Sequence, residues 1–445
     1  MAGWRQKIPK ISFTYETGKS GESLNIKWFG DGSTQSRVVT THLIFWPTLV
    51  LTAIGLMMIF SASTIMEISE GINPYIGFRR TLLIAAIGLM GLFITAGWLT
   101  PTRLRNLALF AYASSLALQL AILTPLGIEV KGNRNWLLIP GINQVIQPSE
   151  FLKLGLAMYL AWVFMSGKVI VSSLRSVMGW VGLPVFFAFF AVMIGHDLGT
   201  LLVFVVLVFS AIFVAGIRLL WLGVAAVIGT GAAAFLIGIS ASRRARVYSF
   251  LVGKEADPLG GDLQSIRARW GLGTGGLTGV GPGASRQKWN YLPEAHTDFI
   301  FAILGEEFGL IGTSVVILLF CLLGFGMVRL IMHAKRVDAC IYAATVAGWI
   351  LSQALINIGV VIGLLPVIGV PLPLVSSGGS AMLATLFAIG VLLSYARDDA
   401  GSPPLSLSRS FPRSSAVVTP GRKRPQGSRV APTRRSRPTA KKGRS

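Results

Sequence analysis

The chain has 445 residues, of which 53% are hydrophobic and only 13% are charged, and its formal net charge is +22. A soluble domain would carry about twice that share of charged residues, so the composition excludes an ordinary soluble enzyme and favours a membrane protein. The positive residues gather in the tails and short loops, which is typical of membrane topology rather than of a nucleic-acid-binding protein.

The apolar residues form blocks of about 18 to 25, the length that crosses a hydrocarbon core of about 30 Å. We therefore predict an all-α bundle of ten transmembrane helices, preceded by a polar tail at residues 1–42. The first apolar run follows that tail without a cleavage signal, so we expect it to stay as an anchor. The predicted spans lie near residues 43–62, 81–98, 106–124, 150–166, 177–194, 199–217, 219–239, 308–332, 341–364 and 381–396.

The charges of the connecting segments predict the orientation. With a cytoplasmic N-terminus, the short inner loops are rich in Lys and Arg and the outer loops hold most of the acidic residues. Both termini are then cytoplasmic, and the longest loop, residues 240–298 between the seventh and eighth spans, is extracytoplasmic. The composition of residues 397–445 predicts a disordered basic tail, with a partner- or lipid-binding role as the alternative.

The first candidate site lies in residues 131–153. Lys131 and Arg134 belong to an outer loop, and a guanidinium can bind a phosphate group through two hydrogen bonds. Glu150 and Lys153 lie one helical turn apart at the start of a short span. They either pair with each other or face a polar cavity and contact a substrate.

The second candidate is the long outer loop. Its glycine run from Gly271 matches the G-x-G-x-x-G pattern, but no βαβ unit surrounds it, so a dinucleotide site is not expected. The run is either a flexible connection or a backbone that approaches a ligand closely. Arg243 before it and Lys288 after it favour an anionic ligand.

The third candidate, residues 291–299, brings Glu294, His296 and Asp298 together at the membrane surface. Either Thr297 or Asp298 simply caps the next helix, or a carboxylate of this cluster acts as a general base, because a partly desolvated carboxylate has a raised pKa. A further segment, residues 364–380, is uncharged and rich in Pro and Gly. Non-helical backbone at membrane depth must be buried in protein or line a cavity, so we predict a re-entrant segment that shapes a groove.

Four segments resemble the signature stretches of the SEDS family, which contains the FtsW, RodA and SpoVE proteins of bacteria. They are Gly-Asn-Arg-Asn-Trp at 132–136, Gln-Pro-Ser-Glu at 147–150, Tyr-Leu-Pro-Glu-Ala-His-Thr-Asp-Phe at 291–299, and Gly-Leu-Leu-Pro with Ser-Ser-Gly-Gly-Ser within 363–380. They occur in this order within residues 43–396, and the third is more similar to the FtsW branch than to the RodA branch.

The resemblance implies a ten-helix SEDS transmembrane domain that polymerises lipid II into glycan strands at the outer face of the inner membrane, during septal division. It implies that Asp298, at the position of the family's essential aspartate, is the general base. It also implies a class B penicillin-binding protein and other division proteins as partners. No cofactor is required by the sequence, beyond a divalent cation (Mg or Mn) that would accompany the lipid pyrophosphate.

The predicted site therefore combines Asp298 with residues expected to contact the substrate. Two other functions fit the same residues, a lipid II flippase and a non-catalytic division scaffold. The expected substrate contacts are Lys131, Arg134, Glu150, Lys153, Arg243, Lys288, Glu294, His296, Ser376 and Gly378.

Overall fold

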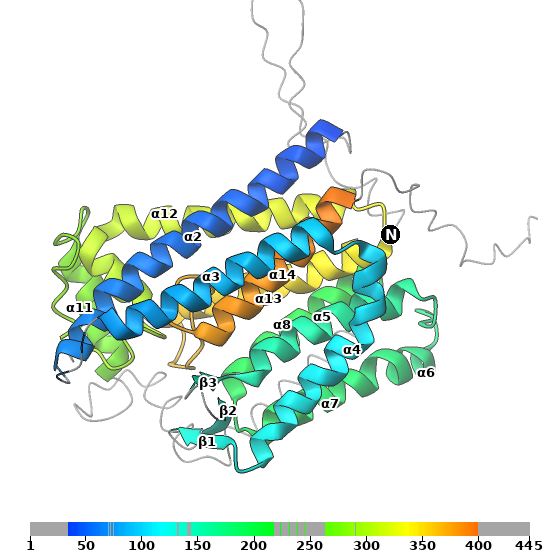
Figure 1. Cartoon of the computed structure of the whole chain (residues 1–445), viewed down its shortest axis with the longest axis horizontal. Helices are drawn as coiled ribbons and strands as arrows, with labels where there is room; N and C mark the ends of the chain where they lie inside the picture. Colours follow the sequence, from blue (N-terminus) through cyan, green and yellow to red (C-terminus); the bar gives the residue numbers. More distant parts are fainter. Residues whose placement is uncertain are drawn as a thin grey trace, which may run out of the picture. The chain divides into compact units, whose positions relative to one another are not determined.

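The computed structural model describes residues 34–217 and 263–398, except residues 70, 72, 74, 131, 132, 140–143 and 290; between the two ranges it describes Gly223, Gly231, Gly238 and Arg244. These residues form long helices and a small sheet (Figure 1). The protein is thus a multi-pass helical membrane protein, as predicted. The helices long and apolar enough to cross a membrane are Val38–Thr64, Tyr75–Trp98, Pro101–Leu123, Leu174–Ile194, Ile300–His333, Val337–Val361 and Gly379–Arg397.

Each predicted span that falls within the described residues coincides with a helix, and the predicted span at 219–239 lies outside them. The long helices are α2 (Thr34–Ser69), α3 (Tyr75–Trp98), α4 (Pro101–Leu120), α5 (Pro148–Met165), α7 (Leu183–Ile194), α8 (Leu198–Val214), α11 (Leu263–Gly275), α12 (Ile300–His333), α13 (Val337–Val361) and α14 (Gly379–Asp398). The short 3₁₀-helix η1 (Ala121–Leu123) extends α4, and α6 (Leu174–Val177) with the π-helix η2 (Met178–Gly182) leads into α7.

Several helices begin earlier than predicted, and the difference is largest for α2 and α12. Helix α2 begins at Thr34, inside the predicted N-terminal tail, because a helix can continue past the apolar residues that cross the membrane. Helix α12 begins at Ile300 rather than near residue 308 and is kinked at Gly309, whose φ is +64°. Glycine adopts this left-handed conformation without a Cβ clash. The segment before the kink, residues 300–307, is completely buried.

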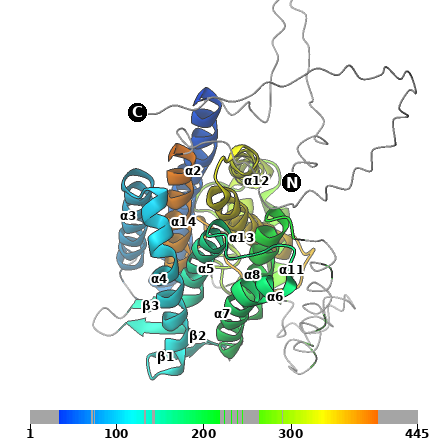
Figure 2. The same cartoon turned by 90° about the vertical axis from the view of Figure 1, so that its right-hand side faces the viewer.

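Small residues let neighbouring helices approach closely. Gly155 of α5 lies against the backbone of α4, Gly348 of α13 lies against α8, and Gly390 of α14 lies against α3. In a lipid bilayer, where apolar burial does not drive helix association, such close van der Waals contact does. Helix α13 lies among α5, α8, α12 and α14 (Figure 2). Its polar side chains therefore point into the interior of the protein.

A three-stranded antiparallel sheet corrects the all-helical expectation. Strands β1 (Gly127–Val130), β2 (Asn133–Ile139) and β3 (Gln144–Ile146) follow one another in the sheet, and Leu137 pairs with Gly127 on one side and Ile146 on the other. The sheet satisfies backbone hydrogen bonds between α4 and α5 without a helix. We call this end of the bundle, with residues 127–147, 291–299 and 362–378, the sheet end.

The glycine run in the predicted 240–298 loop is helical up to Gly275 and non-helical from Gly276 onward. Gly271 and Gly275 belong to α11, which packs against α12. A Cβ on Gly275 would clash with the carbonyl of Gly305, and one on Gly279 would clash with the backbone of Glu307. These glycines allow the backbone to pack against α12. At Gly275 and Gly279 the close approach is to protein backbone, and an approach of the run to a ligand stays a prediction.

Candidate active site

Asp298 lies in the turn before α12, and its side chain is partly exposed. The amide nitrogen Nδ2 of Asn357 donates a hydrogen bond of 2.7 Å to its carbonyl oxygen. The N-cap residue of α12 is Phe299, and no side chain caps this helix. Phe299, rather than Thr297 or Asp298, is thus the N-cap residue, so the helix-cap alternative is wrong.

Glu294 and His296 shape the turn that carries Asp298. Glu294 has a φ of +57°, and its carbonyl oxygen accepts hydrogen bonds from the backbone N–H groups of Thr297 and Phe299. Its carboxylate accepts a hydrogen bond of 2.8 Å from the Thr297 hydroxyl. Burial lowers the pKa of His296, although Glu294 acts in the opposite direction, so the imidazole is neutral near neutral pH.

The segment 362–378 is non-helical, as predicted for a re-entrant segment; residues 370 and 372–376 are buried in the bundle, whereas Ile362 and Leu364 are exposed. The Ser377 N–H donates to the His296 carbonyl at 3.0 Å and so ties the segment to the Asp298 turn. Ser376 is 4% exposed, and its hydroxyl accepts a hydrogen bond from the Leu372 N–H at 2.8 Å. Gly378 donates its N–H to the Ser376 carbonyl. Ser376 and Gly378 thus shape this segment, and their contact with substrate stays a prediction.

Glu150 and Lys153 form a buried ion pair in α5. The Lys153 ammonium lies 2.8 Å from Glu150 Oε1, and both residues are 1% exposed. The same ammonium donates to Gln353 Oε1 at 2.9 Å and lies 4.9 Å from the centre of the Trp349 ring. Of the two alternatives, the structure shows the pairing. Direct contact with a substrate would first require this pair to open.

Lys288 is also buried and paired. Its ammonium lies 2.7 Å from Glu307 Oε1 in the first part of α12 and 2.9 Å from the Ser61 hydroxyl of α2. The Ser61 hydroxyl donates to the same carboxylate oxygen at 2.7 Å. This network ties α2, the loop before Asp298 and α12 together.

Glu306 holds the neighbouring loop. Its two carboxylate oxygens accept hydrogen bonds from the backbone N–H groups of Arg286 and Gln287, at 3.1 and 3.2 Å, and from the Ser285 hydroxyl. Glu306 therefore holds the shape of the loop at residues 285–287.

The remaining predicted cations lie elsewhere or outside the described residues. Arg134 lies on β2, is partly exposed, and donates to the carbonyl of Thr124 at 2.9 Å. Lys131 and Arg243 are outside the described residues. The structure thus brings together Asp298, Glu294, His296, Ser376 and Gly378, with Lys288 on the preceding loop.

Asn135 of β2 donates to Asp197 at 2.9 Å. Asp197 also caps α8 by accepting from the Thr200 N–H, and so joins the sheet to the bundle.

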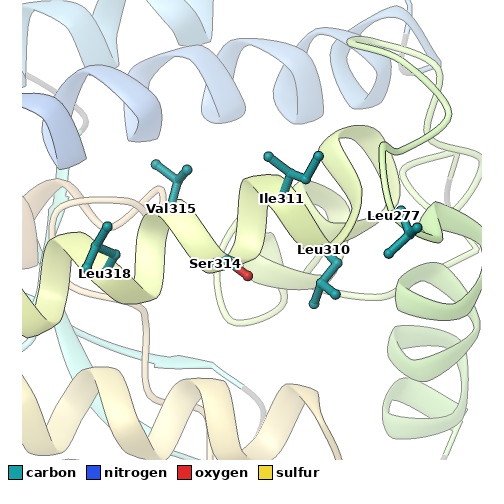
Figure 3. A pocket seen from close by; sticks show the side chains of 6 residues that line it. All are labelled: Leu277, Leu310, Ile311, Ser314, Val315 and Leu318. Atoms are coloured by element: carbon teal, nitrogen blue, oxygen red, sulfur yellow. The ribbon is translucent and has the colours of Figure 1, made fainter.

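The part of the chain that the structure describes holds no group of three His, Cys, Asp or Glu side chains suited to a metal ion. It does hold an apolar groove along α12, just after the Gly309 kink (Figure 3). Ser314 supplies the one hydroxyl in this lining, so the groove is unsuited to sugar or phosphate chemistry. Its lining residues are Leu277, Leu310, Ile311, Ser314, Val315 and Leu318.

Sequence reasoning missed two residues of the site, Gln353 and Asn357. Their amide nitrogens donate to the carbonyls of Pro371 and Val370, at 3.0 and 2.8 Å. Two buried amides four residues apart in an apolar span were the available signal, because polar groups in spans are costly and need partners. Their partners are backbone carbonyls, which no residue pattern identifies.

Comparison with known proteins agrees with this architecture. The family model described as cell cycle protein, for FtsW, RodA and SpoVE, matches residues 41–400. Stage V sporulation protein E of Bacillus subtilis is 38% identical over 357 residues, covering 79% of this chain and 95% of that protein. The probable peptidoglycan glycosyltransferase FtsW of Mycobacterium tuberculosis is 32% identical over 362 residues, covering 80% of this chain and 68% of that protein.

Solved structures share the fold. A chain of a peptidoglycan synthase complex that coordinates polymerization and crosslinking has a TM-score of 0.65 and 27% identity, covering 81% of this chain and 98% of that one. The rod shape determining protein RodA of Thermus thermophilus has a TM-score of 0.60 and 26% identity, covering 81% and 97%. Because the family match extends over nearly all of the helical bundle, this chain belongs to the FtsW, RodA and SpoVE family.

Proposed function

We propose that this protein is a peptidoglycan glycosyltransferase that polymerises lipid II during septal cell division. Relatives that cover most of the chain carry the name peptidoglycan glycosyltransferase FtsW, which supports this activity. The single observation that carries the proposal is the state of Asp298. Asp298 is partly exposed at the sheet end, on a turn held by hydrogen bonds from Asn357 and within residues 294–299.

Polymerisation joins the 4-hydroxyl of one lipid-linked sugar to the anomeric carbon of another chain. A carbon–oxygen bond forms at that carbon, while its bond to undecaprenyl pyrophosphate breaks. The hydroxyl proton passes to the Asp298 carboxylate, which acts as the general base. A single displacement inverts the anomeric centre. The bundle contributes by holding two lipid-linked reactants in contact at one end.

The departing pyrophosphate needs positive charge nearby. Arg134 is the partly exposed candidate among the described residues, and we propose Lys131 and Arg243 as its companions. Lys288 is committed to Glu307, so we assign it to the fold rather than to the leaving group. A divalent cation, where one is required, would be held mainly by the pyrophosphate oxygens.

The location and the partners are part of the proposal. Both termini face the cytoplasm, since the short loops at that side carry the Lys and Arg residues, and the sheet end faces outward. The structural similarity to a peptidoglycan synthase complex supports a class B penicillin-binding protein as the partner, at the division septum.

The test is polymerisation of labelled lipid II by the purified protein with its partner, comparing Asp298→Asn with Glu129→Gln. Glu129 is an exposed carboxylate on β1 and serves as the control. The polymerisation rate should fall by about 10²–10⁴-fold with the first variant and stay at the wild-type value with the second. Unchanged polymer from Asp298→Asn would disprove the base assignment. Movement of lipid II between leaflets without any polymer would favour a flippase instead.

A further inference from the structure

Three segments distant in sequence meet at one side chain, Asn357 of α13. Its Nδ2 donates to the Asp298 carbonyl at 2.7 Å and to the Val370 carbonyl at 2.8 Å. Asn357 itself is 2% exposed. One amide nitrogen therefore joins α13, the turn before α12 and the segment 362–378.

The orientation of this amide is determined by its partners. Both are carbonyl oxygens, which only accept hydrogen bonds, so only the nitrogen can face them. The oxygen Oδ1 of Asn357 is buried and accepts no hydrogen bond from the described residues. The Asn357 amide thus holds the structure through its two donated hydrogen bonds. An apolar residue of the same size would remove those bonds and would also remove the buried oxygen.

Gln353 repeats the arrangement one turn earlier on the same face of α13. Its Nε2 donates to the Pro371 carbonyl, while its Oε1 accepts from Lys153 at 2.9 Å and from Trp349 Nε1 at 2.9 Å. Because Lys153 and Trp349 both donate to Oε1, Nε2 of Gln353 must point to the Pro371 carbonyl. The buried ammonium of Lys153 thereby sets the direction of the Gln353 amide.

Together these bonds place the Asp298 carboxylate relative to the segment 362–378. Asn357 and Gln353 hold the carbonyls of consecutive residues, Val370 and Pro371. The preceding residue, Gly369, lies beside the Asp298 carboxylate. A Cβ added to Gly369 would lie 3.6 Å from Asp298 Oδ2. The backbone of Asp298 and the segment beside its carboxylate are therefore both hydrogen-bonded to the same face of α13.

We propose that Asn357 is a positioning residue for Asp298. Gln353 supports it by holding the segment 362–378, which lies beside Asp298, through the Pro371 carbonyl. This inference rests on the proposed function, since it assumes that Asp298 reacts. Without the two bonds of Asn357, the bond between Ser377 and His296 still ties the segment 362–378 to the Asp298 turn, but the Asp298 carbonyl is no longer held to α13 and can shift. A displacement of about 1 Å costs about 100-fold in rate for a reaction that depends on oriented groups.

The experiment compares Asn357→Leu with Gln119→Leu in the full protein with its partner. Gln119 is a matched control, because it is 1% exposed, donates one Nε2 bond to the Ala191 carbonyl, and also has a buried oxygen without a partner among the described residues. Its contact joins α4 to α7, outside the site. Initial rates are measured over a range of labelled lipid II concentrations, alongside thermal unfolding.

Asn357→Leu should lower kcat about 100-fold with little change in KM, whereas Gln119→Leu should keep the wild-type kcat. A structural role alone would change the thermal midpoint of both variants and the kcat of neither. Equal kcat values for the two folded variants would overturn the proposal. Should Asn357→Leu fail to fold, Asn357→Ala removes both donated bonds with a smaller side chain, and a wild-type kcat for it would equally overturn the proposal.

The result separates this inference from the proposed function. Asp298→Asn is measured in the same series. If that variant polymerises normally, the base assignment fails whatever Asn357 does. If it is inactive while Asn357→Leu matches its control, only the positioning role fails.

Discussion

The ammonium of Lys288 lies 2.7 Å from Oε1 of Glu307, and the two side chains are 2% and 1% exposed. A lysine that binds a leaving group must be accessible to it, whereas this one lies between two transmembrane helices. Removing one partner of a buried ion pair costs about 3–5 kcal/mol, because the other charge is left without compensation. Substitutions of this pair therefore test whether Lys288 stabilises the fold or takes part in the reaction.

Lys288→Met should lower the free energy of unfolding by about 3–5 kcal/mol. The double variant Lys288→Met with Glu307→Gln should recover most of that loss, since no buried charge remains and the amide can still accept from Ser61. Denaturant or thermal unfolding in detergent measures both. A double variant that is stable but makes no polymer would show instead that Lys288 acts in the reaction.

Glu306→Gln should release the loop at residues 285–287. Both oxygens of Glu306 accept hydrogen bonds, so neither orientation of a glutamine amide satisfies every donor. Each buried donor that loses its partner costs about 1–3 kcal/mol. Trypsin should then cut after Arg286 much faster than in the wild type, and Glu129→Gln is the control. Equal cutting rates would contradict the role given to Glu306.

Gly369→Ala should affect both stability and the pH profile. Its φ of +78° costs a residue with a Cβ about 1–2 kcal/mol. The added methyl group would also displace water from the Asp298 carboxylate, which raises its pKa. The acidic limb of the polymerisation profile should move to higher pH.

Gly167→Ala is the matched control, because Gly167 has a φ of +72° with open space around its Cβ position. It should show the stability loss without any shift in the pH profile. A shift in both variants, or in neither, would contradict the placement of Gly369 beside the carboxylate.

The lowered pKa of His296 should make the stability of the folded protein depend on pH. Its pKa is lowered in the folded protein because burial disfavours the charged imidazole. As pH falls below about 6.5, the unfolded chain binds a proton more readily than the folded one, so stability decreases until the lowered pKa is reached. Thermal midpoints of the wild type and of His296→Gln, measured at pH 7.5 and 5.5, check this. The variant should lose less stability on acidification, and an equal loss would refute the assignment.

The spans could be predicted from the sequence because membrane depth imposes long apolar runs whatever the tertiary contacts are. The start of α5 at Pro148 and the non-helical segment 362–378 followed from local signals in the same way. The small sheet was missed, since residues 133–135 are polar and show no strand alternation. Its pairing depends on contacts such as that between Asn135 and Asp197.

The candidate site was predicted in part. Asp298, Glu294 and His296 are close in sequence, so their meeting required no knowledge of the fold. The pairing of Lys288 with Glu307 joins the loop to α12 beside Ser61 of α2, and no local sequence pattern reports this contact. Asn357 acts on backbone carbonyls from two other segments, and therefore only the packed structure reveals it.

The central claim is that Asp298 takes the proton of the attacking hydroxyl. The most direct measurement is the initial rate of polymerisation by Asp298→Asn at saturating labelled lipid II, with binding of lipid II and partner verified separately. The account predicts intact binding and a rate lower by about 10²–10⁴-fold, the usual contribution of a general base. A rate equal to that of the wild type, with binding unchanged, would contradict it.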